Sequence, residues 1–132
     1  DKTKQDSFIL FGDGSHVTVD EVEQWNFPNV DLVVLSACQT GLGGELGDGK
    51  EILGFGYLMQ NAGADAAIAS LWSVDDKGTQ VLMNKFYEVL KQGNVTKAEA
   101  LRQAQIALIT KVEYGLEHPY FWAPFILIGN GL

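Results

Sequence analysis

The sequence predicts an α/β fold, a three-layer sandwich on a mainly parallel β-sheet. Two continuous apolar runs, VDLVVLSAC (residues 30–38) and ADAAIASLW (residues 64–72), have the pattern of strands that are covered on both faces. Segments with helical periodicity follow each run, so strands and helices alternate along the chain. A last apolar run, FWAPFILIG (residues 121–129), is predicted to be another strand. With 132 residues the chain is long enough to bury a core around such a sheet.

The segment before the first long run predicts a strand, a turn and a short helix. Residues 8–11 form a short apolar run that a Gly-Asp-Gly turn closes. Thr18 and Glu21 have the spacing of a capping box, which opens a helix, and Pro28 ends that helix. His16 then falls in the turn ahead of the helix, where a solvent-exposed residue is expected.

Three further segments have helical spacing. Apolar residues over 52–59 follow a glycine-rich loop at residues 40–50, and the helix is expected to stop near residues 61–63. Thr96 and Glu99 form a second capping box, which opens a helix that runs to about Thr110. A third helix is predicted between these two by a stripe of apolar residues at helical spacing, and this helix ends at Gly93. The members of the stripe are Val81, Leu82, Phe86, Val89 and Leu90; the inward residues of the helix up to Thr110 are Ala100, Leu101, Ala104 and Leu108.

Composition excludes several classes of protein. Seventeen acidic against nine basic residues give a net charge of −8, which argues against nucleic-acid binding. No apolar run reaches the roughly 18 residues of a membrane span, and no signal peptide is recognisable, so no membrane partner is expected. A single cysteine excludes an internal disulfide and a cysteine-built zinc site, and favours the cytoplasm. Neither the glycine-rich run nor the acidic residues have the spacing of a phosphate loop or a metal site, so no cofactor or metal is expected.

Cys38 permits two interpretations. It directly follows an apolar strand, and in open α/β sheets the carboxyl ends of the strands face the ligand crevice. The glycines after it, from Gly41 onward, would let backbone N–H groups approach a substrate carbonyl oxygen as an oxyanion hole requires. In the other interpretation Cys38 is a small buried core residue, as free cysteines commonly are. Position alone does not decide between them.

Asp75 and Asp76 follow the second long strand. If the two strands are parallel, these carboxylates lie at the same sheet edge as Cys38 and could bind a basic substrate side chain. Alternatively, one of them caps a helix that begins near Gly78, a role that Thr79 could also fill. A nucleophilic cysteine also needs a base. Of the two histidines, His16 lies in a turn, and His118 is expected to support the loop before the last strand through its ring nitrogens.

Several separated segments together resemble the CHAT domain, a caspase-like cysteine peptidase domain that is often joined to tetratricopeptide repeats. The segments are DLVVLSACQTGLG, GFGYLMQNAGADAAIASLWSVDD, MNKFYEVL, EALRQAQIALI and HPYFWAPFILIG. The resemblance runs from SFILFGDG to FILIG, which is nearly the whole chain, and the motifs stand in the family's order.

The resemblance implies a caspase-like sandwich that carries a Cys–His dyad and cleaves a protein or peptide substrate. By the SACxTG motif, Cys38 takes the place of the nucleophile, and Gly41 belongs to the loop that holds the oxyanion. Asp75 and Asp76 fall in the region where related peptidases build a pocket for the residue before the scissile bond. An acidic pocket there favours Arg or Lys. A bacterial parent protein that also carries tetratricopeptide repeats is implied as well.

One departure from the family has consequences for activity. The dyad histidine of the family lies upstream of the SFILFGDG region, and no such motif occurs here. Residues 1–132 are therefore expected to be the C-terminal portion of a single CHAT domain whose N-terminal strands are missing, and to be inactive alone. The exposed sheet surface would allow self-association. The alternative function is a non-catalytic regulatory or protein-interaction domain on a caspase-like scaffold.

Overall fold

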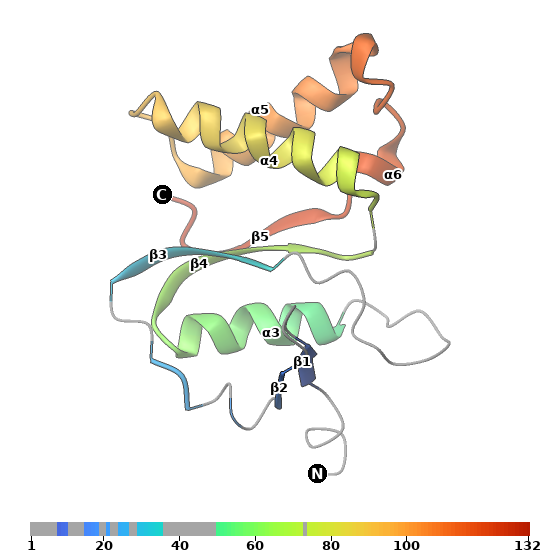
Figure 1. Ribbon diagram of the computed structural model, residues 1–132. Helices are drawn as coiled ribbons and strands as arrows, with labels where there is room; N and C mark the ends of the chain where they lie inside the picture. The colour runs from blue at the N-terminus through green and yellow to red at the C-terminus, as the bar shows by residue number, and fades with distance from the viewer. Residues whose placement is uncertain are drawn as a thin grey trace.

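A three-stranded sheet lies at the centre of the computed structural model (Figure 1). Its order is β3 (Val30–Leu35), β4 (Ala64–Ser70) and β5 (Phe125–Gly129), with β4 in the middle. The structure describes residues 8–10, 15–18, 21, 24–26, 29–35, 50–72 and 74–132.

Helices cover both faces of this sheet, which confirms the α/β class. Helix α3 (Lys50–Asn61) lies on one face (Figure 1). The opposite face carries α4 (Asp76–Lys91), α5 (Lys97–Thr110) and the short α6 (Pro119–Trp122). A 3-10 turn, η1 (Val112–Tyr114), connects α5 to the α6 segment.

The core lies on both sides of β4 because its consecutive residues point to opposite faces. Ile68 packs with Leu82, Phe86 and other buried residues of α4 and α5. Ala67, its neighbour in the strand, packs instead with Met59 of α3. The expected helix stripes are confirmed: the inward residues are Leu82, Phe86 and Val89 in α4, and Ala100, Leu101, Ala104 and Leu108 in α5.

The described sheet is mixed, whereas the sequence predicts a mainly parallel one. β3 pairs with β4 in parallel, but β4 pairs with β5 in antiparallel orientation. Among the described residues, α3 is the helix between the parallel strands, and it returns the chain to the starting edge. Two successive helices, α4 and α5, separate β4 from β5, so the chain reaches β5 at the edge where β4 ended and must run back.

The described part of the N-terminal segment contains a strand, β2 (His16–Thr18), that is not among the elements predicted from the sequence. β1 (Phe8–Leu10) and β2 form an antiparallel pair in which His16 is opposite Leu10. His16 therefore begins a strand and is not a turn residue; the β-branched residues after it favour extended backbone. The capping box is confirmed, because Thr18 N–H donates to Glu21 Oε2 at 2.8 Å and Glu21 N–H donates to Thr18 Oγ1 at 3.4 Å.

The last strand begins later than predicted, at Phe125, because the residues before it form α6. Pro119 occupies the first turn of α6, where its fixed φ suits a helix and its missing N–H costs nothing. Pro124, which is fully buried, directly precedes the strand. Phe121 and Trp122 consequently belong to the helix and not to the sheet.

Helix α5 starts at its predicted cap, and its first turn carries a charged cluster. Thr96 Oγ1 accepts from Glu99 N–H at 3.1 Å. The Glu99 carboxylate binds the Arg102 guanidinium with both oxygens, each at 2.7 Å, and accepts from Gln103 Nε2 at 2.9 Å. The hydrogen bonds from Arg102, followed by the one from Gln103, lower the pKa of Glu99 to about 2.

The positive φ of Gly129 predicts a large cost for a side chain there. Gly129 has φ +96°, and a Cβ on it would lie 2.6 Å from the Asp65 carbonyl oxygen. Gly93 is the matched control, since its φ is +75° and no atom lies near its Cβ position. Gly93→Ala should cost about 1–2 kcal/mol through backbone strain alone, and Gly129→Ala about 1–3 kcal/mol more through the clash. Urea unfolding of both variants checks this, and equal losses of stability would contradict it.

The lowered pKa of Glu99 predicts a pH dependence of stability. Because the folded pKa lies below the ordinary value of 4.5, the contribution is complete above pH 4.5 and is lost as the pH falls toward about 2. Glu99→Gln should therefore be less stable than wild type at pH 6, and the difference should shrink on acidification. Arg102→Gln should show the same trend. A Glu99→Gln variant whose urea midpoint follows the wild-type pH curve would contradict the assignment.

Candidate functional site

The carboxyl ends of β3 and β4 lie side by side at one sheet edge. Their parallel register pairs Leu35 with Ala69, so both strands run toward the same edge. This is the arrangement that the sequence argument required for Cys38 and the acidic pair to lie near each other. Cys38 and Gly41 themselves lie outside the described residues.

Asp75 is the N-cap of α4. Its Oδ1 accepts from Gly78 N–H at 2.9 Å, and its carbonyl oxygen accepts from Thr79 N–H at 3.1 Å. The backbone of Asp75 is extended, with φ −61° and ψ 157°, as is usual for a cap residue. The capping interpretation is therefore confirmed for Asp75. The helix starts at Asp76, two residues before the predicted start, and Thr79 is inside it.

Asp76 has a different environment from its neighbour. It occupies the first turn of α4 and is exposed. Within the described part of the chain, its carboxylate makes no hydrogen bond or ion pair. The positive end of the helix dipole favours a negative charge at this position. The two aspartates therefore differ in role: the Asp75 carboxylate fixes the helix start, and the Asp76 carboxylate is exposed.

Hydrogen bonds connect the turn between β4 and α4 to Tyr120 in α6 and to Pro124 just after it. Leu71 N–H donates to the Pro124 carbonyl oxygen at 2.9 Å. The Ser70 hydroxyl donates to the Trp72 carbonyl oxygen. The Trp72 indole Nε1 donates to the Tyr120 carbonyl oxygen at 3.0 Å. The bonds from the Leu71 N–H and the Trp72 indole join this acidic turn, which runs from Leu71 to Asp75, to residues that are far away in the sequence.

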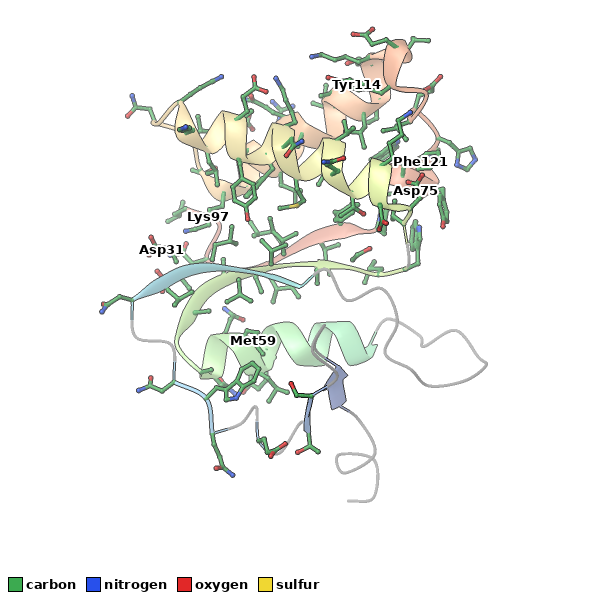
Figure 2. All side chains as sticks on the ribbon, in the orientation of Figure 1. Asp31, Met59, Asp75, Lys97, Tyr114 and Phe121 are labelled. Atoms are coloured by element: carbon green, nitrogen blue, oxygen red, sulfur yellow. The ribbon has the colours of Figure 1, made fainter. Side chains whose placement is uncertain are left out.

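Phe121 of α6 lies against the first turn of α4. Figure 2 shows Asp75 and Phe121 together at one end of the structure, whereas Asp31 and Lys97 lie toward the other end. Gly78 explains the close approach: a Cβ there would lie 2.9 Å from Asp75 Oδ1 and 3.2 Å from Phe121 Cδ1. Any larger residue at position 78 would push on the cap and on α6 at once.

His118 has a structural role, as expected. Its Nδ1 accepts from Tyr120 N–H at 3.1 Å and so caps α6. The carbonyl oxygens that follow are also bound, because Gln105 Nε2 donates to Trp122 O at 2.9 Å and to Phe125 O at 3.0 Å. His118 therefore stabilises the loop before the last strand through a ring nitrogen.

Two further observations concern metals and membranes. No group of three His, Cys, Asp or Glu residues that could hold a metal ion occurs among the residues that the structure describes. None of the described helices is long and apolar enough to cross a membrane.

Sequence reasoning missed the structural role of Trp72. Trp72 is 36% exposed and makes a specific hydrogen bond through its indole N–H. One signal could have pointed to it: a tryptophan two residues after a strand end carries an N–H that usually finds a partner when partly buried.

The cap predicts different effects for substitutions at the two aspartates. Asp75→Ala should lower the free energy of unfolding by about 1 kcal/mol, because it removes the acceptor for Gly78 N–H. Asp75→Asn should cost only a few tenths, since asparagine caps nearly as well. Asp76→Asn, the matched control, should change stability by less than about 0.5 kcal/mol. Urea unfolding checks all three, and a cost for Asp76→Asn equal to that of Asp75→Ala would contradict the division of roles.

Comparisons with known proteins agree with the sequence resemblance. The CHAT domain family matches residues 1–130. Human tetratricopeptide repeat protein 28 is 33% identical over 101 residues, which is 76% of this chain but only 4% of the human protein. The chain thus spans a small part of that relative, and no solved structure matches it. Because the family match covers nearly the whole sequence, the chain belongs to the CHAT domain family.

Proposed function

We propose that this chain is part of a cysteine endopeptidase domain that uses a Cys–His dyad and cleaves after a basic residue. Membership of the CHAT family supports the proposal, because the sequence resemblance relates that family to caspases. The observation that carries it is the shared edge of β3 and β4, beyond which the SACQTG motif and the exposed carboxylate of Asp76 follow in the sequence.

In the proposed reaction, the Cys38 thiolate attacks the carbonyl carbon of the scissile peptide. Backbone N–H groups of the loop that contains Gly41 hold the oxyanion, which then collapses to an acyl-enzyme as the C–N bond breaks. A histidine gives its proton to the leaving amine. His118 is not assigned this role, because it caps α6. As the family resemblance implies, we assign the role to a histidine that is not among residues 1–132.

Substrate selection in this proposal depends on Asp76. Asp75 already accepts from Gly78 N–H, so its carboxylate is partly committed to the helix. Asp76, the first residue of α4, is exposed and is the carboxylate that would pair with an arginine or lysine side chain. A charge-assisted bond of this kind is about twice as strong as a neutral one. The expected substrate is therefore a peptide with a basic residue before the scissile bond.

The parent protein is proposed to carry tetratricopeptide repeats as well. Support comes from the human relative, whose name states that it is a tetratricopeptide repeat protein. This chain corresponds to 4% of that protein's length, so most of such a parent would consist of other segments. Repeats of this type form extended binding surfaces, which suits them to present a protein substrate to the domain.

A second candidate function is a non-catalytic regulatory or protein-interaction domain. One observation favours it: both His118 and Asp75, two residues with possible catalytic or binding chemistry, have structural roles here as helix caps. The two functions differ in whether the parent protein hydrolyses peptides.

Cleavage of peptide substrates by the parent protein tests the proposal. The substrates should differ only at the residue before the scissile bond, with arginine in one and norleucine in the other. Cys38→Ala should abolish cleavage of both. Asp76→Asn should lower kcat/KM for the arginine peptide by about tenfold or more and leave the norleucine peptide unchanged. Asp75→Asn is the control and should have little effect on either.

Two outcomes would contradict the proposal. Unchanged turnover in the Cys38→Ala variant would exclude Cys38 as the nucleophile. No cleavage of either peptide by the wild-type parent protein would favour the regulatory or interaction domain.

A further inference from the structure

We propose that Trp72 is a positioning residue that joins the acidic turn to α6, so that the turn and α6 together set the selectivity for a basic substrate residue. The selectivity part rests on the proposed function, because it takes Asp76 as the carboxylate that binds the substrate. The joining part rests on contacts of the described residues alone.

Trp72 is held through both its main chain and its side chain. The Ser70 hydroxyl donates to its carbonyl oxygen. The indole Nε1 donates to the Tyr120 carbonyl oxygen at 3.0 Å, across 48 positions of sequence. Ser70 is a buried polar residue at the end of β4, so this end of the link is anchored in the sheet.

At the other end of the link, α6 is itself fixed to α5. Gln105 on α5 donates from one amide nitrogen to the carbonyl oxygens of Trp122 and Phe125. Phe121 lies against Gly78, whose N–H donates to Asp75. A shift of α6 would therefore reach the acidic turn by two routes, through the Trp72 indole and through Gly78.

The link determines how firmly the Asp76 carboxylate is held. Asp76 begins α4 directly after the turn, and its side chain has no partner within the described residues. Its position therefore depends on the backbone before and after it. Without the indole bond, the remaining hydrogen bond between the described start of the turn and the residues in and just after α6 is that from Leu71 N–H to the Pro124 carbonyl oxygen. A binding group must be held to within about 0.5 Å by its surroundings to act selectively.

Trp122 provides a matched control. Its indole Nε1 also donates to a backbone carbonyl oxygen at 3.0 Å, that of Glu117. That bond is local to the α6 segment and does not involve the acidic turn. Trp72→Phe and Trp122→Phe therefore each remove one indole N–H and keep an aromatic ring, but only the first breaks the link.

Amide hydrogen exchange on the 132-residue chain tests the link without any need for activity. Trp72→Phe should raise the exchange rates of Gly78 N–H and Thr79 N–H by about five- to tenfold, the loss expected for one neutral hydrogen bond. Trp122→Phe should leave both rates unchanged. Equal rates in wild type and Trp72→Phe, or an equal increase in both variants, would overturn the proposal.

Kinetics of the parent protein test the effect on selectivity. Trp72→Phe should raise KM for the arginine peptide by about five- to tenfold, with little change in kcat and none for the norleucine peptide. Trp122→Phe should leave the ratio of the two peptides unchanged. A loss that is equal for both peptides would overturn the selectivity role. A wild-type protein that cleaves neither peptide would contradict the peptidase proposal instead, and hydrogen exchange would then decide the joining role alone.

Discussion

The rest of the structure depends on the burial of β4 on both of its faces. Six of its seven residues are buried, and four of them are alanines. Apolar side chains on both faces require a covering layer on each side, which α3 and the α4–α5 pair supply (Figure 1). The small alanine side chains also let these helices lie close to the sheet. Since β4 is the central strand, the core fixes the position of its carboxyl end, and the turn and α4 continue the chain from that position.

The residues beyond that end form one connected unit. Asp75 fixes the start of α4, Trp72 ties the turn to α6, and Gln105 ties α6 to α5. All of these bonds end on backbone groups, so they set the path of the chain rather than the identity of the neighbouring side chains. Asp76 is placed by this framework while its own carboxylate is left unengaged by the described residues. A substrate-binding group needs this combination of a rigid support and an available charge.

Local signals predicted much of the fold, and contacts between distant residues determined what they missed. The strand runs and the cap at Thr96 could be identified from a few neighbouring letters. The direction of β5 could not be identified in this way. Both helices between it and β4 are predicted, but local periodicity does not show that they lie on the same face of the sheet and so return the chain to the edge where β4 ended (Figure 1). Local sequence also could not choose a cap among Asp75, Asp76 and Thr79, since each can accept a hydrogen bond. In the structure Gly78 N–H donates to Asp75, and Phe121 lies so near Gly78 that a Cβ there would be 3.2 Å from Phe121 Cδ1. The nucleophilic role of Cys38 still rests on the family resemblance.

Covalent labelling of the parent protein tests the central claim most directly, because it reports the nucleophile and the acidic recognition group together. The reagent is a peptidyl acyloxymethyl ketone with arginine at the position before the reactive group, and the adduct is located by mass spectrometry. We predict one adduct, on Cys38, that forms at least about tenfold faster than with the norleucine reagent and loses this advantage in Asp76→Asn. Absence of an adduct on Cys38, or equal rates for both reagents in the wild type, would contradict the account.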